Sequence, residues 1–563
     1  MAYKRLGDLL IAAGVIDEAQ LKQGLAAQKE SGKRLGDAMI AAGIITESQL
    51  IKALEEQLGV EFVDVSSVRL YPELAQAVPK AIAKKYNVIP VRIDRDELYL
   101  AMSDPLNFMA VEDVKNISKK RVIPVIATTE AVERAILNLY GNENATKAME
   151  EMKRDAGDGD YVSESVTGTV LDSDTEASPT IRLVNGIVER AVTEHASDIH
   201  LEPRDGEMSV RLRIDGVLRN VMNIPHEIQS SVIARIKVMG GMNTAERRVP
   251  QDGRANVRVR ASDVDLRINS LPTIYGEKIV IRLLDKSAAI FSRQGIGMDE
   301  HNIPRFERIM HSTAGVILIS GPTGSGKSST MSTMVRELNT EGVNITTLED
   351  PVEYNIDGVN QVQINEKIGM TFASGLRAIL RQDPDIISVG EIRDGETAEI
   401  AMRSAITGHL VLSTIHTNDS IATLDRLLDI GVPPYLTTAA LKGVISQRLV
   451  RRICPNCRKP YYPTDDELDL LEMKREPGLM FYRGEGCANC YRTGYKGRTG
   501  VFEILVMTHE MRQAVMHNAD RYEMMETALK DGFITMNDRA RQLVREGVTT
   551  VEEAARTINS TNE

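Results

Sequence analysis

The run Gly321-Pro322-Thr323-Gly324-Ser325-Gly326-Lys327-Ser328 constrains this chain more than any other stretch, because it fits the pattern G-x-x-x-x-G-K-[ST]. It follows the apolar run 316–320 and precedes residues 328–338, which suit a helix. In such a strand–loop–helix unit the glycines let backbone N–H groups converge on phosphate, and the lysine reaches the outer phosphate oxygens. We therefore expect Gly321 to Ser329 to cradle nucleotide phosphates, with Ser328 as a ligand of Mg²⁺, rather than to form an ordinary glycine-rich turn.

Two acidic segments lie further along the chain. The apolar run 386–389 ends just before Gly390 and Glu391, where P-loop enzymes place the carboxylate that handles Mg²⁺ or the attacking water. Because position 390 lacks the usual aspartate, Glu391 is the predicted general base. Glu349 and Glu353 follow another strand-like run and would face a nucleotide at the edge of the sheet, although a solvated acidic surface is the alternative.

Two histidines, His409 and His416, flank the apolar run 410–415. Their separation of seven residues puts them on opposite faces of a strand, so joint metal ligation is not expected. Taken alone, each is as readily an ordinary core or surface histidine.

The four cysteines form two C-x-x-C pairs, Cys454 with Cys457 and Cys487 with Cys490. Four thiolates from two tight turns make a closed tetrahedral zinc site, which stabilises structure and leaves no open position for catalysis. A redox role is the weaker alternative, because one reactive pair would be enough for it.

A duplication marks the start of the chain: residues 5–28 recur 29 positions later as residues 34–57. Each copy has helical apolar spacing around a glycine turn. Asp17 with Gln20, and Thr46 with Gln49, stand where a helix cap and its reciprocal partner belong. The repeat therefore predicts two helix–turn–helix units in residues 1–60.

The length of 563 residues is three to four times a usual domain of ~150 residues, so several domains are expected. The predicted parts are the following: an N-terminal domain at 1–140 (repeat at 1–60, α/β part at 61–140), a flexible acidic linker at 141–178, an α/β domain at 179–285 opening with a helix at 179–200, a nucleotide-binding domain at 286–500 with the cysteine knuckles at 451–492, and a helical region at 501–563. The net charge of −12 disfavours a nucleic-acid partner, and no apolar run approaches the ~18 residues of a membrane span. We expect a cytoplasmic chain without a span of its own.

Together, these motifs resemble those of the secretion-superfamily ATPases of type IV pilus assembly and type II secretion. Segments 196–203, 248–254 and 276–278 are similar to the family's second N-terminal domain, and segments 349–353, 390–394 and 409–416 to its Asp box, atypical Walker B and His box. The resemblance covers nearly the whole chain. It implies an α/β multidomain fold with a RecA-like P-loop NTPase core, preceded by a smaller α/β domain and an N-terminal helical-repeat domain.

The resemblance also implies function. Glu391, Lys327, Glu349, Glu353, His409 and His416 would act in ATP hydrolysis, and Arg267 and Arg282 would reach the phosphates as arginine fingers do. Both arginines lie in alternating strand patterns, so a strand-edge salt bridge is the alternative. The implied cofactors are ATP, Mg²⁺ and Zn²⁺. The implied partners are a homohexamer, an inner-membrane pilus platform protein and cytoplasmic pilus assembly proteins.

The tandem repeat is similar to the MshEN domain, which binds cyclic di-GMP in some of these ATPases. Its arginines would stack on guanine or fork to phosphate, its glycines allow close approach, and its leucines bury the bases. The implied ligand-binding residues are Arg5, Leu6, Gly7, Asp8, Leu10, Leu21, Leu25 and Gln28, with Arg34, Leu35, Gly36, Asp37, Met39, Leu50, Leu54 and Gln57. The alternative is a domain that docks only to the secretion platform.

Three competing functions stay open at this point. A type II secretion ATPase shares every ATPase motif with a pilus assembly ATPase. A cyclic di-GMP receptor with a weak ATPase is less favoured, because Lys327, Ser328 and Glu391 are all intact. A DNA translocase is disfavoured by the acidic charge balance and the few aromatic residues.

Overall fold

The computed structural model describes residues 6–31, 35–42, 44–45, 55, 59–65, 68, 70–71, 73–105, 107–155, 178–259, 262–285 and 291–562. The chain divides into two compact units. The first unit contains Met1–Leu283 and Glu485–Gly494, and the second contains Leu284–Gly484 and Tyr495–Glu563. Among the described helices, none is long and apolar enough to cross a bilayer.

The first unit begins with short helices. They are α1 (Leu6–Ala12), α2 (Glu18–Ser31) and α3 (Leu35–Ala41). The reciprocal cap predicted at the start of α2 is present: the Asp17 N–H donates to Gln20 Oε1 at 3.0 Å, and the Gln20 N–H donates to Asp17 Oδ1 at 2.7 Å. The predicted cap of the second copy lies outside the described residues.

A small α/β body follows. Its elements are α5 (Glu73–Ala77), α6 (Lys80–Tyr86), β1 (Val88–Asp94), β2 (Glu97–Met102), α7 (Phe108–Ser118), β3 (Arg121–Ile126) and α8 (Thr129–Asp155). The strands form one sheet in the order β1-β2-β3. The prediction of a flexible linker from residue 141 was wrong at its start, because α8 continues to Asp155. Ala148 and Met152 explain this extension: both are buried in the core of the next body, so the polar run has an apolar anchor.

The remainder of the first unit is a second sheet with two helices. Its elements are α9 (Pro179–Thr193), β4 (Asp198–Pro203), β5 (Glu207–Ile214), β6 (Val217–Pro225), α10 (His226–Met239), β7 (Gln251–Val259), β8 (Ser262–Thr273) and β9 (Gly276–Asp285), and the strand order is β6-β5-β4-β9-β8-β7. The predicted helix 179–200 ends early, at Thr193. His195 adopts a left-handed φ of 51°, which stops the helix and lets the chain enter β4.

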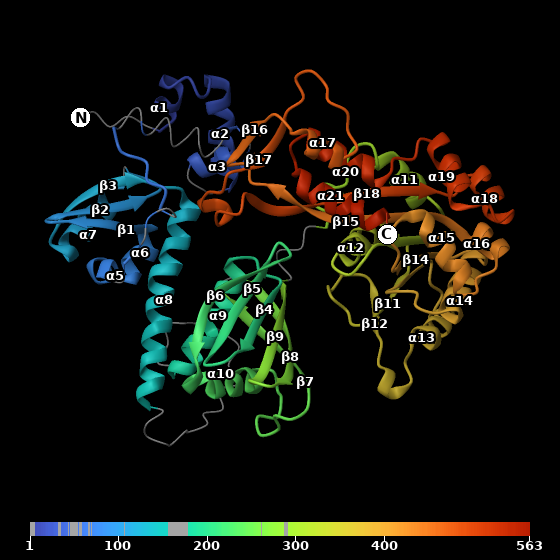
Figure 1. Cartoon of the computed structure of the whole chain (residues 1–563), viewed down its shortest axis with the longest axis horizontal. Helices are drawn as coiled ribbons and strands as arrows, with labels where there is room; N and C mark the ends of the chain where they lie inside the picture. Colours follow the sequence, from blue (N-terminus) through green and yellow to red (C-terminus); the bar gives the residue numbers. More distant parts are fainter. Residues whose placement is uncertain are drawn as a thin grey trace. The chain divides into compact units, whose positions relative to one another are not determined.

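The second unit is built on a seven-stranded sheet in the order β12-β11-β13-β14-β10-β15-β18 (Figure 1). Its strands are β10 (Gly315–Ser320), β11 (Ile345–Glu349), β12 (Asn360–Gln363), β13 (Ile386–Val389), β14 (Leu410–Ile415), β15 (Leu441–Ile453) and β18 (Tyr495–Val506). Every neighbouring pair is parallel except β15 with β18. This is the layered α/β architecture that the alternating strands and helices predict.

Helices pack on both faces of this sheet: α11 (Ile303–Met310) and α12 (Lys327–Leu338) belong to one apolar core, and α13 (Phe372–Ile379), α14 (Gly395–Ile406), α15 (Ser420–Asp429), α16 (Pro434–Ala440), α18 (His509–Met516) and α19 (Arg521–Lys530) to the other. The helices α20 (Met536–Arg545) and α21 (Val551–Asn562) form a further core, and η1 (Glu366–Ile368) precedes α13. Between β15 and β18 lie β16 (Arg458–Tyr461), α17 (Asp465–Leu470), β17 (Phe481–Gly484) and η2 (Ala488–Cys490). The region predicted as helical from residue 501 begins with a strand, because β18 runs to Val506 as the antiparallel neighbour of β15.

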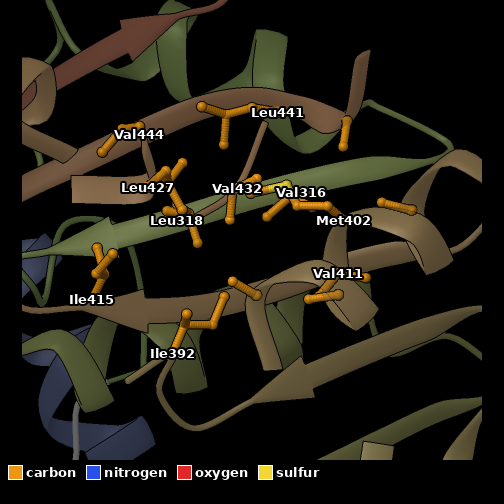
Figure 2. Packing of buried hydrophobic residues seen from close by; sticks show 14 of the residues in the cluster. Val316, Leu318, Ile392, Met402, Val411, Ile415, Leu427, Val432, Leu441 and Val444 are labelled. Carbon is orange, nitrogen blue, oxygen red and sulfur yellow. The ribbon is translucent and has the colours of Figure 1, made fainter. Parts of the chain in front are cut away.

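Two apolar cores sandwich the sheet, and β10 contributes to both. Val316 and Leu318 belong to the core shown in Figure 2, whereas Ile317 and Ile319 belong to the core on the opposite face. All six residues of β10 are buried. A strand that is apolar on both faces is stable only in the middle of such a sheet, so the run 316–319 places the loop that follows at the centre of one sheet edge.

Candidate functional site

The predicted phosphate loop connects β10 to α12. Gly321 adopts a φ of +145°, and a Cβ on it would lie 2.5 Å from the Gln447 carbonyl oxygen and 2.5 Å from Ser325 Oγ. Only glycine fits this position, because a larger residue would be both strained and overlapped. Gly326, with a φ of +91°, is the N-cap of α12, so the helix amino end opens directly onto the loop.

Lys327 folds back over the loop. Its Nζ donates to the carbonyl oxygens of Gly321 at 2.7 Å and Pro322 at 3.2 Å, and it lies 3.4 Å from His416 Nδ1. Burial lowers the pKa of Lys327 to about 8, with Arg448 adding to the decrease and Glu391 opposing it. An incoming polyanion would favour the charged ammonium form of a lysine held in this way.

The loop fits the phosphates of a nucleotide. No heavy atom lies within 4 Å of a Cβ placed on Gly324, so this part of the loop is open to a ligand, and its φ of +80° suits a turn of successive N–H groups. The first N–H groups of α12 lie at the same place and carry the positive end of the helix dipole. Ser328 is exposed in the first turn of α12, where its hydroxyl would serve as a ligand of Mg²⁺ next to bound phosphate.

Glu391 lies just beyond β13, at the same sheet edge as the loop. The segment before it is fixed on both sides: the Gly390 N–H donates to the Leu348 carbonyl at 2.7 Å, and Thr414 Oγ1 donates to the Gly390 carbonyl at 2.7 Å. A Cβ on Gly390 would lie 3.1 Å from the Leu348 carbonyl oxygen. This crowding explains why the carboxylate stands one residue beyond the expected aspartate position.

The carboxylate of Glu391 has two basic neighbours. Its Oε2 lies 3.2 Å from His416 Nε2, and its Oε1 forms an ion pair with the guanidinium of Arg393. The side chain of Glu391 is only 18% exposed. Ser320 is paired with Ile415 across β10 and β14, so the residues that follow these strands emerge side by side. The structure thus brings Lys327, His416 and Glu391 together as a continuous polar chain.

The two other predicted acids lie next along the edge. Glu349 is the last residue of β11, and its Oε1 accepts hydrogen bonds from Thr347 Oγ1 at 2.7 Å and Gln361 Nε2 at 2.9 Å. Glu353 is half-buried, four residues further on. Because β11 pairs with β13, Glu349 stands beside the strand that leads to Glu391.

His409 is not brought to this edge. It precedes β14, whereas His416 follows it, so the two rings lie at opposite ends of the strand. The His409 Nδ1 contacts the Ser404 carbonyl oxygen at 2.9 Å. A catalytic role for His409 stays a prediction that the geometry of a single chain does not support.

Arg267 and Arg282 belong to the first unit, where they lie on the neighbouring strands β8 and β9. Arg282 is 62% exposed, and its Nε donates to Asp198 Oδ1 at 3.1 Å. Arg267 lies opposite Arg254 in the β7–β8 pair. The strand-edge ion pair considered for these arginines is therefore present for Arg282, while their role toward phosphate stays a prediction.

Sequence reasoning missed the residues that support the site from the side. Gln447, on β15, donates from Nε2 to the Ser325 carbonyl at 2.7 Å and so holds the phosphate loop. Arg448 follows it and donates from Nη2 to the Asn418 carbonyl at 3.2 Å. Neither residue belongs to a recognisable motif, and both lie about 120 residues after the loop. The available signal in the sequence was two successive polar residues in a largely apolar, buried strand.

The four cysteines come together as predicted. Their sulfur atoms all lie within 4.8 Å of one another, and no disulfide joins them. Cys490 Sγ accepts hydrogen bonds from the Cys487 N–H at 3.1 Å and the Gly494 N–H at 3.2 Å, as ligand sulfurs in such tight turns do. Sulfur ligands at ~2.3 Å from zinc in a tetrahedron stand about 3.8 Å apart, and Cys487 and Cys490 match this at 3.8 Å. The cluster is consistent with structural zinc.

The N-terminal repeat is described only in part. Arg5, Arg34, Leu50, Leu54 and Gln57 lie outside the described residues, and so do the side chains of Asp8 and Asp37. In the described part, Leu10 and Ile16 of the first copy share a buried cluster with Met39 and Ile45, which are their equivalents 29 residues later. Leu6, Leu21 and Leu35 pack against this cluster, while Leu25 is 47% exposed and Gln28 is half-buried.

Two glycines allow this close packing. A Cβ on Gly7 would lie 2.7 Å from Leu21 Cδ1, and a Cβ on Gly24 would lie 2.6 Å from Met39 Cγ. Gly36 is also buried. The glycine of the first motif copy therefore serves helix packing, in addition to any approach by a ligand.

Comparison with known families matches most of the chain. The family described as Type II/IV secretion system protein matches residues 173–556, and the MshEN domain matches residues 58–146. The MshEN match begins after the tandem repeat, so it covers the α/β body and not the residues predicted to contact cyclic di-GMP.

Three characterised relatives agree with this assignment. The type IV pilus assembly ATPase PilB of Myxococcus xanthus is 37% identical over 98% of both chains. The PilB of Thermus thermophilus is 41% identical over 90% of this chain, which spans 57% of that relative's length. The type II secretion system ATPase E of Vibrio cholerae is 40% identical over 81% of this chain and 91% of the relative. With its phosphate loop, its strand-end carboxylate and these matches, the chain belongs to the type II/IV secretion system protein family, the ATPases of pilus assembly and secretion.

Proposed function

We propose that this chain is a hexameric motor that hydrolyses ATP to drive pilin polymerisation in type IV pilus assembly. The arrangement of Lys327, His416 and Glu391 at one sheet edge is the observation that supports it most directly. A pilus assembly ATPase is similar over the full length of the chain, and so is a type II secretion system protein E, so this coverage supports the family and not the choice between the two.

In this proposal, Lys327 leaves the carbonyl oxygens of Gly321 and Pro322 and binds the outer phosphate oxygens of ATP. Glu391 accepts a proton from the attacking water, which raises the nucleophilicity of that water. Arg393 and His416 contact the two oxygens of Glu391 and would fix the direction of the carboxylate. Mg²⁺, held by Ser328 together with phosphate oxygens, would offset the charge that develops on the transferred group.

Arg267 and Arg282 would complete the site as cations that stabilise charge in the transition state. Their place on two adjacent strands allows both to approach one ligand from the same sheet. In a hexamer, domains of one subunit or of its neighbour can supply such groups. Zinc, bound by Cys454, Cys457, Cys487 and Cys490, would hold the connection between β15 and β18 without taking part in hydrolysis.

Cyclic di-GMP regulation is part of the proposal. The repeated motif supplies two equivalent sets of groups, and the ligand has two equivalent halves. The shared cluster of Leu10, Ile16, Met39 and Ile45 supports a paired arrangement of the copies, which a two-fold ligand requires. The adjacent MshEN match at residues 58–146 supports this part of the proposal, because domains of this type bind the dinucleotide in some of these ATPases.

The second candidate is a type II secretion ATPase, because a type II relative is as similar to the chain as the pilus relatives are. Deleting the gene and restoring wild type or Lys327→Ala separates the two. Surface pili and secreted proteins are counted in each strain. The pilus assignment predicts that pili disappear and return only with wild type, while secretion is unchanged; loss of secretion with normal pili would replace it by the type II assignment.

A further inference from the structure

A buried carboxylate on β18 connects two helix ends in the second unit. Glu503 is 3% exposed. Its Oε1 accepts hydrogen bonds from the Ser420 N–H at 2.7 Å and the Ser420 hydroxyl at 2.9 Å, and its Oε2 accepts from the Met536 N–H at 2.8 Å. Ser420 is the first residue of α15, and Met536 is the first residue of α20.

All three of these groups donate to Glu503, so both of its oxygens act as acceptors. Burial raises the pKa of Glu503, and the hydrogen bonds from Ser420 and Met536 oppose this increase. An amide in its place would turn one N–H toward a backbone N–H donor. Two helix amino ends supply favourable dipoles that help to offset the cost of a buried charge.

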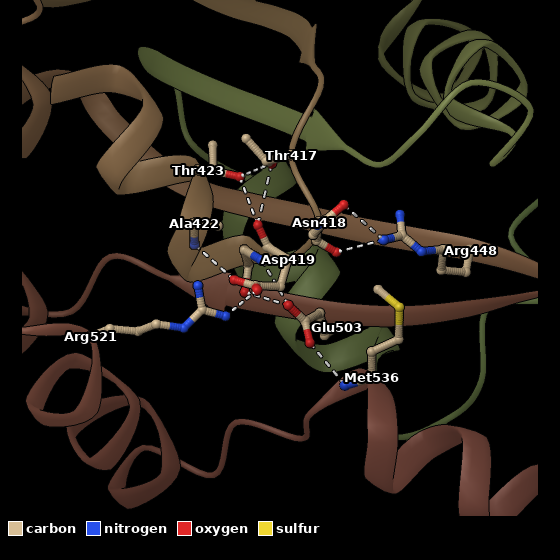
Figure 3. Close-up of polar contacts among 10 residues, drawn as sticks. Thr417, Asn418, Asp419, Ala422, Thr423, Arg448, Glu503, Arg521 and Met536 are labelled. Atoms are coloured by element: carbon tan, nitrogen blue, oxygen red, sulfur yellow. Dashed lines mark hydrogen bonds and ion pairs between the residues drawn. The ribbon is translucent and has the colours of Figure 1, made fainter. Parts of the chain in front are cut away.

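The helix α15 starts directly after the loop of residues 417–419, and His416 immediately precedes this loop. Each residue of the loop is held by hydrogen bonds (Figure 3). Thr417 Oγ1 lies 2.7 Å from Thr423 Oγ1, Arg448 Nη2 donates to the Asn418 carbonyl at 3.2 Å, and Asp419 caps α15 by accepting from the Ala422 N–H at 2.7 Å. Arg521 forms an ion pair with Asp419 on its other side.

The strand β15 contacts both this loop and the phosphate loop. Gln447 and Arg448 are successive residues of β15, so their side chains leave opposite faces of the sheet. Gln447 binds Ser325, and Arg448 binds Asn418. Ser446, the residue before them, lies opposite Glu503 in the β15–β18 pair. The framework around His416 is therefore continuous with the framework around the phosphate loop.

From this arrangement we infer that Glu503 is a positioning residue for ATP hydrolysis: through Ser420 it fixes the loop 417–419 and thereby sets the place of His416 beside Glu391. The inference rests on the proposed ATPase function. Because Glu503 is buried, we expect its effect on the rate of the chemical step and not on the phosphate contacts of Lys327.

The test uses the full-length chain and Glu503→Gln, which keeps shape but loses one acceptor. Glu553→Gln is the control, since Glu553 is also buried, at 6% exposed, and accepts the Arg451 N–H at 2.9 Å near the start of α21. It also pairs with the Arg451 guanidinium at 2.8 Å, and α21 belongs to a different apolar core from α15. We expect kcat to fall about tenfold or more in Glu503→Gln with KM within threefold, in line with the loss of general acid–base alignment. In Glu553→Gln we expect a lower Tm with kcat within twofold of wild type.

A double-mutant cycle with His416→Ala separates positioning from general destabilisation. If Glu503 acts through His416, the double variant hydrolyses ATP no more slowly than His416→Ala alone, within about twofold. The inference would be overturned if the rate losses of the two single variants multiplied in the double variant, or if Glu503→Gln had the kcat of wild type. If Glu503→Gln does not fold, Ser420→Ala, which removes only the hydroxyl bond, is expected to lower kcat a few-fold with the same non-additivity.

Failure of the proposed function gives a different result. A wild-type chain without ATP turnover refutes the ATPase assignment itself. Normal turnover in both wild type and His416→Ala removes His416 from the mechanism, and the role of Glu503 is then refuted with it.

Discussion

Glu391 and His416 meet at 3.2 Å between Oε2 and Nε2, although 25 residues separate them in sequence. They follow two neighbouring parallel strands, β13 and β14, whose carboxyl ends reach the same sheet edge. Lys327 lies on the other side of His416, so the imidazole stands between an ammonium group and a carboxylate. In the proposed mechanism this ring would link phosphate binding by Lys327 to water activation by Glu391.

The first prediction separates these two parts. Lys327→Ala loses nucleotide binding and turnover, because the phosphate contact is gone. Glu391→Gln binds ATP normally but hydrolyses it about 10²–10⁴-fold more slowly, as loss of a general base does. Nucleotide binding and phosphate release are measured for both; Glu391→Gln turning over within tenfold of wild type would exclude Glu391 as the base.

The second prediction concerns pH. In the free chain, burial holds the pKa of Lys327 at about 8, and bound triphosphate raises it, since the phosphate charge favours the ammonium. ATP binding above pH 8 therefore takes up a proton, and affinity falls with rising pH by up to about tenfold per unit. Calorimetry at pH 8.5 in buffers of different ionisation enthalpy measures the uptake. No proton uptake, with affinity constant from pH 7 to 9.5, would contradict the assignment.

A third prediction addresses Arg267 and Arg282. Replacing either by Ala lowers kcat about 100-fold or more, because a cation that stabilises the transition state is lost. Stability changes little, since Arg282 is 62% exposed and its buried partner, Asp198, keeps Arg213 and the Ser197 hydroxyl as neighbours. Arg258→Ala is the control, as Arg258 is another exposed arginine of the same sheet that pairs with an aspartate, Asp263. Full activity in Arg267→Ala or Arg282→Ala assigns that residue to the strand edge alone.

The fourth prediction is one zinc ion per chain. Elemental analysis of protein purified without chelator should give this ratio, and all four thiols should stay unreactive until the metal is removed. Cys457→Ser should lose zinc and lower the Tm, because metal binding contributes folding free energy. Asn456→Ala, in the same turn but without a thiol, keeps the metal. Metal-free protein, or a Cys454–Cys457 disulfide under reducing conditions, argues against the site.

The fifth prediction is that one cyclic di-GMP binds per chain and that both repeats contribute. Arg5→Ala and Arg34→Ala should each weaken binding at least about fivefold, more than an exposed charge pair is worth, because each removes a bidentate contact. Lys22→Ala, an exposed charge on α2, should have no effect. Calorimetry on the full chain, with GTP as the comparison ligand, measures this affinity. An affinity that is unchanged in both arginine variants would support the platform-docking alternative.

The sequence predicted the parts of the site that depend on local chemistry. The phosphate loop, the strand before Glu391 and the cap of α2 all follow from residues within a few positions of one another. Gln447 and Glu503 were not found, because their partners, Ser325 and Ser420, lie 122 and 83 residues away. The hydrogen-bond partner of a polar side chain inside a buried strand can be identified only once the sheet order is known.

The linker prediction was wrong at residues 141–155 for a related reason. Composition alone made this stretch too polar to bury area. In the structure, Ala148 and Met152 suffice, because α8 is already nucleated by its first half, which packs on the preceding sheet through Val132, Ile136 and Tyr140. Extending an existing helix costs less conformational entropy per hydrogen bond than nucleating a new one.

The pairing of Ser446 with Glu503 also restricts the positions at which residues can be inserted into this chain. Successive side chains on β18 alternate between the two faces, so a shift by one position would drive the carboxylate into the apolar cluster of Phe502 and Ile504 and leave the start of α15 facing a hydrocarbon. Residues inserted between β15 and β18 cost little in themselves, since the entropy of closing a longer loop grows slowly. Residues added in the exposed turn 474–478 are therefore expected to be tolerated, whereas an insertion within β18 itself changes its phase and removes both helix anchors at once.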